Sequence, residues 1–260
     1  MPPEALTVIA CGALAREITR LIAFSKLHWV TLACLPATLH NRPERIPEAV
    51  RGAIHRARER GASRIVVAYA DCGTGGLLDQ VLAEEGVVRL EGAHCYAAYA
   101  GQEAFAALAE AEPGTFYLTD FLARQFDTLV VEGLGLDRHP ELRDAYFGNY
   151  TRLVLLAQSD DAALTAKAEA AARRLGLAFE RVFTGMGELA TFVQAAADGT
   201  IHGATDHSLL ARHPGPGDRQ GGPPDGQAPA RGALRAGDRP GSDAGEAHRD
   251  GSLSRAVAEI

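Results

Sequence analysis

Short apolar segments alternate with helical segments along most of this chain, and this alternation limits the folds open to it. The expected strands are Leu6–Ala10, Trp29–Leu35, Arg64–Ala70, Val87–Leu90, Arg152–Ala157 and Ala178–Thr184. The expected helices between and after them are Ala13–Phe24, Ile46–Arg60, Leu77–Glu85, Ala162–Leu175 and Glu188–Asp198. Strands that alternate with helices form right-handed βαβ units and pair in parallel. The sequence therefore predicts an α/β fold with an open, mostly parallel sheet of about six strands and helices on both faces.

Residues 97–150 interrupt the alternation and are expected to form a helical, aromatic insertion. Helical spacing covers Ala97–Ala111, Thr115–Thr128 and Glu141–Tyr150, and Thr115 or Thr119 could cap the middle helix. Its aromatic side chains either belong to the core or roof a pocket. Residues 1–200 are expected to make one domain that contains this insertion.

Charge and hydropathy exclude several classes of function. The chain has a net charge of −7 and a pI of about 5.7, so it lacks the basic balance typical of nucleic-acid binding. It has no apolar run of about 18 residues, so no membrane-spanning helix is expected. The start of the chain lacks a signal segment, so we expect a cytoplasmic protein with its four cysteines reduced.

The composition changes after about residue 202. No Val, Ile, Phe, Tyr, Trp, Lys or Asn occurs between His202 and Ala256, where Gly, Pro, Asp, Arg and Ala dominate. Such a segment buries too little apolar area to offset the entropy of ordering it. Residues 206–260 are therefore expected to be disordered, or else to be an out-of-frame translation of a GC-rich gene.

Three of the four cysteines occur where an expected strand ends. Cys11 closes the first strand, Cys72 follows the third, and Cys95 follows the fourth directly after His94. The carboxyl ends of parallel strands share one edge of the sheet, where ligands bind. The sequence therefore predicts that these thiols converge, although each could also be a small buried residue.

Cysteine and histidine are good zinc ligands, so this edge is a candidate metal site formed by Cys11, Cys72, Cys95 and His94. No Cys-x-x-Cys pair exists, which excludes zinc ribbons and ferredoxin-type clusters. Catalytic zinc with an open coordination position and a three-cysteine iron–sulfur cluster both fit the spacing. A metal-free nucleophile is a third possibility, with Cys72 at a helix N-terminus the best placed.

Residues beside the cysteines are candidates for ligand binding. The turn Gly73, Thr74, Gly75 and Gly76 could hold an anionic group with its backbone amides. His40 and Arg42 follow the second strand at the same edge and could bind an anionic or polar group. Cys34 is expected to pack inside its strand, and Glu17 to lie on an exposed helix surface.

Five segments together resemble a prokaryotic family, the domain of unknown function number 1638, over about residues 5–195. They are Cys11-Gly12-Ala13-Leu14, Leu39-His40-Asn41-Arg42-Pro43-Glu44, Asp71-Cys72-Gly73-Thr74-Gly75-Gly76, His94-Cys95-Tyr96 and Gly114-Thr115-Phe116-Tyr117-Leu118-Thr119-Asp120-Phe121. The family has no settled activity. Some members are encoded near corrinoid-dependent methyl-transfer genes, so the resemblance implies a link to that chemistry.

These observations lead to one main hypothesis and two alternatives. The main hypothesis is a cytoplasmic metal-binding protein, a metal-dependent transferase in thiol- or corrinoid-linked methyl transfer, with a small molecule or a corrinoid protein as its partner. The first alternative is an accessory protein that carries a metal, cluster or cofactor without turnover of its own. The second is a metal-free ligand-binding domain with inert cysteines.

Overall fold

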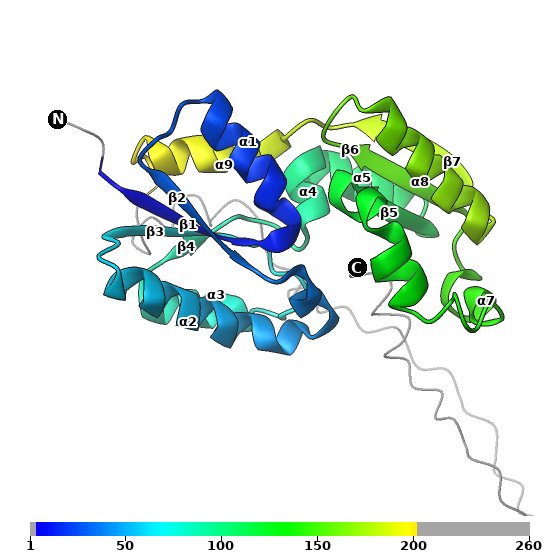
Figure 1. Ribbon diagram of the computed structural model, residues 1–260, viewed down its shortest axis with the longest axis horizontal. Coiled ribbons are helices and arrows are strands. Elements are labelled where there is room, and N and C mark those ends of the chain that lie inside the picture. The colour runs from blue at the N-terminus through cyan, green and yellow to red at the C-terminus, as the bar shows by residue number, and fades with distance from the viewer. Residues whose placement is uncertain (1–3, 202–260) are drawn as a thin grey trace, which may run out of the picture.

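The computed structural model describes residues 4–201, so the expected tail 206–260 lies outside the described residues. The α/β class is confirmed, but the strands within this part form two parallel sheets, of four and three strands, instead of one sheet of about six. Figure 1 shows the two sheets side by side, each with its own helices.

The first sheet has the strand order β2-β1-β3-β4. Its strands are β1 (Leu6–Cys11), β2 (Val30–Leu35), β3 (Arg64–Ala68) and β4 (Val88–Arg89). Helices α1 (Ala15–Phe24) and α9 (Gly187–Ala197) lie on one face, and α2 (Ile46–Glu59) and α3 (Leu77–Glu85) on the other (Figure 1). Short turns of helix complete this unit: η1 (Gly12–Leu14), η2 (Ala37–Asn41) and η3 (Pro43–Arg45).

The sheet grows from β1 in opposite directions, because β2 pairs with one side of β1 and the next strand, β3, pairs with its other side. The connection after β1 leads to α1 on one face, and the connection after β3 leads to α3 on the opposite face. Such a switch point opens a crevice at the carboxyl ends of the strands, where ligands bind in α/β sheets. Cys11 and Cys72 follow the two strands that flank this crevice.

The second sheet has the order β5-β6-β7, with β5 (Thr115–Thr119), β6 (Arg152–Ala157) and β7 (Ala178–Phe183). The helical segments around it are α5 (Gln102–Ala111), α6 (Asp120–Arg124), η4 (Asp127–Glu132), α7 (Leu142–Phe147) and α8 (Ala162–Leu175). Every residue of β5 is buried, and β6 is buried from Leu153 onward. Each sheet thus has a hydrophobic core of its own.

Two connections join the sheets. The chain leaves the first sheet through α4 (Cys95–Ala100) and returns through α9, which packs on α1 and α4. The connections touch at Gly187, where a Cβ atom would lie 2.1 Å from the Tyr99 carbonyl oxygen. Only glycine permits this close approach, which brings α4 and the start of α9 together between the sheets.

The expected insertion 97–150 differs from the structure in two places. Thr115–Thr128 was expected to be one helix, but Thr115–Thr119 forms strand β5 and only Asp120–Arg124 continues as helix α6. A short buried apolar run has no periodicity that separates a strand from a helix. Ala97–Ala111 is divided into α4 and α5 at Gly101, which has a φ of 87°. The expected cap is confirmed, because the Leu122 amide donates to Thr119 Oγ1 at 3.3 Å.

Two further predictions about burial were wrong. Cys34 is exposed, because β2 is an edge strand with a neighbour on one side only. Glu17 is 1% exposed instead of lying on a helix surface, because α6 of the second sheet covers that face of α1 through Arg124. Within residues 4–201 no helix has the length and apolar character needed to cross a bilayer.

Candidate functional site

Cys11 joins strand β1 to the following helical turn. Its Sγ accepts a hydrogen bond from the Ala13 amide at 3.3 Å, and its side chain is buried. The next residue, Gly12, has to be small, because a Cβ atom there would lie 2.9 Å from the Leu35 carbonyl oxygen of the neighbouring strand. The β1 end is therefore held against the β2 end, with the Cys11 thiol at the start of a helical turn.

Cys72 has an unusual backbone conformation. Its φ is 51°, in the left-handed region that residues with a Cβ rarely adopt. Strain of this kind persists where the surroundings enforce it, and it concentrates at functional sites. The following turn is built on Asp71, whose carboxylate accepts hydrogen bonds from Thr74 Oγ1 at 2.6 Å and from the Gly75 and Gly76 amides at 3.1 and 3.0 Å.

Cys95 is the first residue of α4, and His94 is the extended residue immediately before it. Two backbone hydrogen bonds fix this segment beside the end of β3. The Asp71 amide donates to the Gly92 carbonyl at 2.9 Å, and the Cys72 amide donates to the Ala93 carbonyl at 2.8 Å. The structure therefore brings the third cysteine to the same edge as the second.

His40, on η2, lies against Cys11. Its Nδ1 is 3.0 Å from the Ala37 carbonyl oxygen and 3.6 Å from Cys11 Sγ. A carbonyl oxygen only accepts, so Nδ1 carries a proton, and in the neutral ring Nε2 is the nitrogen with the lone pair. Histidines that bind metals commonly have this arrangement, with one ring N–H fixed by a backbone carbonyl.

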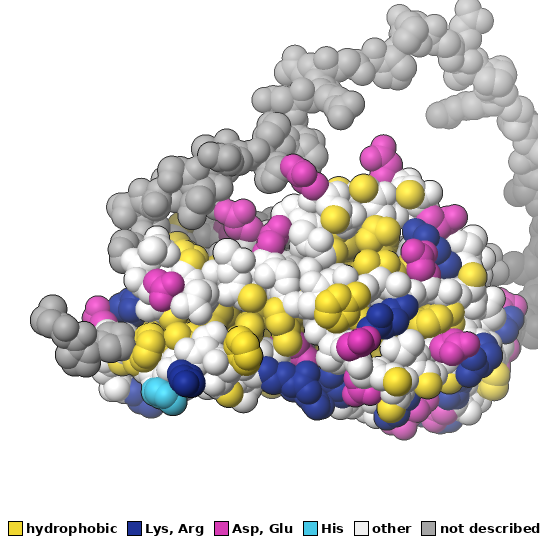
Figure 2. Space-filling view, turned by 90° about the horizontal axis from the view of Figure 1, so that it is seen from above, with side chains coloured by type: hydrophobic (Ala, Val, Ile, Leu, Met, Phe, Trp, Pro, Cys, Tyr) yellow, Lys and Arg dark blue, Asp and Glu magenta, His cyan; other side chains and the backbone are white. Residues whose placement is uncertain are grey.

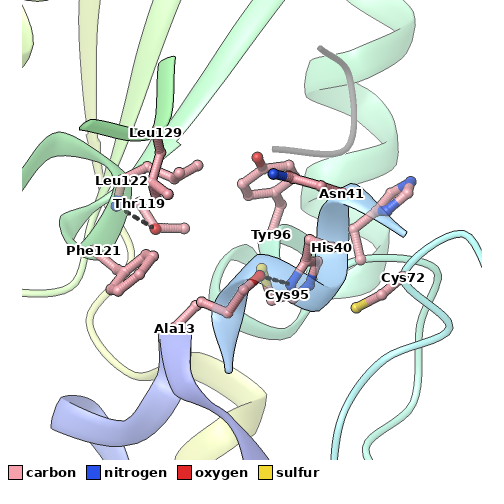
Figure 3. Close-up of a pocket in the computed structure, with 12 residues that line it drawn as sticks. Ala13, His40, Asn41, Cys72, Cys95, Tyr96, Thr119, Phe121, Leu122 and Leu129 are labelled. Atoms are coloured by element: carbon pink, nitrogen blue, oxygen red, sulfur yellow. Dashed lines mark hydrogen bonds between the residues drawn. The ribbon is translucent and has the colours of Figure 1, made fainter. Parts of the chain in front are cut away.

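His40, Cys72, His94 and Cys95 line one pocket between the two sheets (Figure 3). One wall comes from the first sheet and α4, and includes His40, Asn41, Cys72, Cys95 and Tyr96. The opposite wall comes from the second sheet. It contains Thr119, Phe121, Leu122 and Leu129. Polar and sulfur-bearing groups thus face a mainly apolar wall.

Burial raises the pKa values of two of the thiols. Burial raises the pKa of Cys11 to about 11, although the Ala13 amide partly opposes this shift. Burial also raises the pKa of Cys95 well above its usual range, and negative charge on Cys72 or Cys11 would raise it further. Cys95 therefore lies close enough to Cys72 and Cys11 for their charge to affect its ionisation. We call Cys11, Cys72, Cys95, His40 and His94 the thiol site.

The structure separates the other predicted ligand-binding residues from this pocket. Arg42 is exposed and does not line it, and neither does the turn Gly73–Gly76. The amides of Gly75 and Gly76 donate to Asp71, so the chain's own carboxylate occupies the position expected for an anionic ligand. His94 lines the pocket with Cys72 and Cys95, whereas Cys11 does not line it and has its Sγ 3.6 Å from His40 Nδ1.

Sequence reasoning missed most of the apolar wall. Thr119, Leu122 and Leu129 come from the second sheet, and no pattern in the sequence places that sheet opposite the cysteines. Asn41 could have been found, because it belongs to the segment that contains His40. Phe121 and Tyr96 line the pocket, while Phe116 and Phe147 are core residues, so the aromatic side chains serve both purposes.

A buried ion cluster crosses the boundary between the sheets. Arg124 Nη1 on α6 lies 3.6 Å from Glu17 Oε1 on α1, and its Nη2 lies 3.4 Å from Asp120 Oδ2. Neither Glu17 oxygen has a hydrogen-bond partner within the described residues, and burial raises the pKa of this carboxyl. The first helix and the second sheet are thus joined by one arginine shared between two carboxylates.

A second hollow lies between α1 and α9, lined chiefly by apolar side chains such as Leu21, Phe24 and Val193. Figure 2 shows hydrophobic side chains interspersed with acidic and basic ones on the upper side of the view in Figure 1. Asp198 is the one acidic or basic residue in this lining, so the hollow has no set of groups comparable to the thiol site.

The fold and the pocket define a two-sheet α/β protein with thiols and imidazoles at the switch point of its first sheet. The model of the family described as "Protein of unknown function (DUF1638)" matches residues 34–193, and the chain belongs to this family. No curated protein matches the chain, and no solved structure matches it.

Proposed function

We propose that this protein binds a soft metal ion, zinc or the iron of an iron–sulfur cluster, through the thiolates of Cys11, Cys72 and Cys95. The observation that carries the proposal is the convergence of these residues: Cys72, Cys95, His40 and His94 line one pocket, and His40 Nδ1 is 3.6 Å from the Cys11 sulfur. A cation among these thiols favours their deprotonation. His40 or His94 supplies the fourth donor.

The raised pKa values of Cys11 and Cys95 argue against either of these two thiols as a metal-free nucleophile. A nucleophilic cysteine needs a lowered pKa and access to solvent, whereas buried thiols with raised pKa values are inert. A metal ion converts the same buried thiols to thiolates, and the energy of metal binding offsets the cost of ionising them.

Metal binding requires side chains to turn. Among residues 4–201, no three Cys, His, Asp or Glu side chains stand together at the spacing that holds a metal ion. A cysteine side chain has a single torsion to rotate, and rotation about it moves the sulfur while the backbone stays in place. Cys72 and Cys95 line one pocket with His40, and such rotations would bring the Cys11 sulfur, which lies 3.6 Å from His40 Nδ1, toward an ion held there.

The apolar wall supports a role in methyl transfer, which deepens the proposal. In that role a metal held by Cys11, Cys72 and Cys95 would supply the positive charge that lowers the pKa of a small bound thiol, so that it would be a thiolate near neutral pH. The thiolate sulfur forms a bond to the methyl carbon, and the donor, a small methylated compound or a corrinoid protein, leaves with the electron pair. Phe121, Leu122 and Leu129 exclude water from the transferred group.

The pocket also favours a second function, that of an accessory protein that carries the metal or cofactor without turnover. Its one apolar wall, presented by the second sheet, would then contact the partner or the cargo. Turnover by the isolated, metal-loaded chain separates the two functions, because a carrier releases its metal to an acceptor but converts no substrate.

Metal content tests the proposal directly. The full chain is purified aerobically and anaerobically, and its bound elements are measured beside Cys72→Ser, Cys95→Ser and the control Cys34→Ser, whose side chain is exposed on an edge strand. We expect bound zinc or iron in the unsubstituted chain and in Cys34→Ser, and its loss in the other two. Less than about a tenth of an equivalent of any metal under both conditions overturns the proposal, because such sites bind tightly.

A further inference from the structure

The pocket between the two sheets is too small for a ligand in this arrangement of the chain. It has a volume of about 40 Å³. One water molecule needs about 10–15 Å³, so the pocket has room for a few waters, whereas pockets that hold small ligands have volumes of about 300–1,000 Å³. Because the walls of the pocket come from both sheets, a larger ligand enters only if the sheets move apart.

The contact of Glu17 with Arg124 crosses the boundary that such a movement opens. The Glu17 side chain is 1% exposed, and neither of its oxygens has a hydrogen-bond partner within residues 4–201. Arg124 Nη1 lies 3.6 Å from Glu17 Oε1, which is beyond hydrogen-bond length. A buried carboxylate is costly unless it is both paired and hydrogen-bonded, so Glu17 makes the closed arrangement of the sheets less stable.

Asp120, the other carboxylate beside Arg124, has partners within the second sheet. The Gln158 amide donates to its Oδ1 at 3.1 Å, and Ser159 Oγ donates to its Oδ2 at 2.5 Å. Arg124 Nη2 donates to the same Oδ2 at the longer distance of 3.4 Å. Asp120 therefore keeps its hydrogen bonds when the sheets separate or when Arg124 is replaced. Glu17 alone depends on Arg124 for compensation of its charge.

Both connections between the sheets contain a glycine that can act as a hinge. Gly101 lies between α4 and α5 with a φ of 87°, and Gly185 follows β7 with a φ of 58°. The Gly185 amide still donates to the Ala157 carbonyl of β6 at 3.2 Å, whereas Gly187 already packs against the Tyr99 carbonyl of α4. Hinges are a few residues at the ends of elements that absorb changes of backbone dihedral angle, and glycine does so at the lowest steric cost.

We propose that the two sheets open and close over the pocket about Gly101 and Gly185, and that Glu17 and Arg124 set the balance between the open and closed arrangements. Burial of Glu17 favours the open arrangement, because water reaches the carboxylate there, and the charge of Arg124 offsets part of this effect in the closed one. A ligand that contacts both walls then shifts the population toward closure. This inference goes beyond the proposed function and does not depend on a metal ion.

The distance between two labels measures the opening. Nitroxides are attached to keto-bearing residues introduced in place of Glu59 on α2 and Lys167 on α8, both of which are exposed, so that the cysteines stay unmodified. Pulsed electron paramagnetic resonance then gives the distribution of label distances in the reduced, metal-free full chain. Because no metal is added, the result stands whether or not the proposed metal site exists.

Three variants are compared with the labelled chain that carries no further substitution. Arg124→Met leaves Glu17 buried without a cation, so we expect the population with the longer label distance to rise about tenfold or more. Glu17→Met combined with Arg124→Met removes the carboxylate as well, and should bring this population back to its original level or below. Arg152→Met is the matched control and should leave the distribution unchanged. The Arg152 side chain is 22% exposed against 18% for Arg124, and its partner Glu180, at 2.6 Å, lies in the same sheet.

The double variant separates this inference from a merely structural ion pair. If it is as open as Arg124→Met, the pair simply holds the sheets together, and the inference is overturned. An unchanged distribution in Arg124→Met, or equal opening in Arg152→Met, also overturns it. If Arg124→Met does not fold, melting curves decide: the double variant should fold when the uncompensated Glu17 is the cause, and a double variant that also fails to fold contradicts the inference.

Discussion

Replacement of Cys72 by glycine and by alanine measures whether this residue is kept for its thiol. A left-handed conformation costs a residue with a Cβ about 1–2 kcal/mol. Cys72 adopts it with a φ of 51°, so glycine relieves the strain at this position and alanine does not. Both variants remove the same buried sulfur, so the difference between them isolates the backbone.

The expected difference follows from two opposing effects. Relief of strain favours the Cys72→Gly variant by about 1–2 kcal/mol, and the greater freedom of glycine in the unfolded chain opposes it by about 0.5–1 kcal/mol. The free energy of unfolding of Cys72→Gly should therefore exceed that of Cys72→Ala by about 0.5–1 kcal/mol. For a folded part of this size, that is a rise in melting temperature of about 1–4 °C.

Lys26 provides the control. It has a φ of 53° but lies exposed just after α1, away from the thiol site. Lys26→Gly should exceed Lys26→Ala by a similar margin in thermal and urea unfolding of the full chain. The reasoning is refuted if Cys72→Gly is no more stable than Cys72→Ala while the Lys26 pair shows the difference. Confirmation means that the chain tolerates strain at Cys72 in exchange for a thiol in the pocket.

Two further predictions concern carboxylates. Burial raises the pKa of Glu17 above 4.5, so the protonated side chain contributes to stability below pH 4.5, and this contribution is lost as the pH rises through the pKa of the folded state. Glu17→Gln should abolish this pH dependence of the melting temperature. A pH dependence that survives in Glu17→Gln contradicts the assignment. Burial opposes the shift at Asp71, but hydrogen bonds from Thr74, Gly76 and Gly75 lower its pKa below 3.8. Asp71→Ala should therefore reduce the free energy of unfolding by about 1–3 kcal/mol at pH 7, and by progressively less as the pH falls below 3.8. A reduction that is as large below pH 3.8 as at pH 7 counts against the hydrogen-bond network.

The sequence predicted the first sheet well because local signals agree there. The strand ends at Cys11, Cys72 and Cys95 followed from apolar runs closed by glycine turns, and the parallel pairing followed from the intervening helices. β5 was missed because Phe116-Tyr117-Leu118 is apolar on both faces, which fits a buried strand and a buried helix equally. The division into two sheets depends on contacts such as that of Gly187 with Tyr99, which are far apart in sequence.

The candidate site was predictable in part for the same reason. His94 and the cysteines could be placed at one edge, since strand ends share that edge in any parallel sheet. The burial of Glu17 and the apolar wall with Phe121 depend on how the second sheet packs against the first. The amides of Gly75 and Gly76 donate hydrogen bonds to the Asp71 carboxylate, and this depends on side-chain geometry that the sequence of the turn does not specify.

Counting the protons released when zinc is added to the reduced, metal-free chain tests the central claim most directly. The thiols of Cys11 and Cys95 are protonated at pH 7, so their conversion to zinc thiolates must release protons. We predict close to one proton per thiol ligand when calorimetric titrations in buffers of different ionisation enthalpy are compared, and a smaller release in Cys95→Ser. Zinc that binds without releasing protons, or no binding at all, would contradict the account.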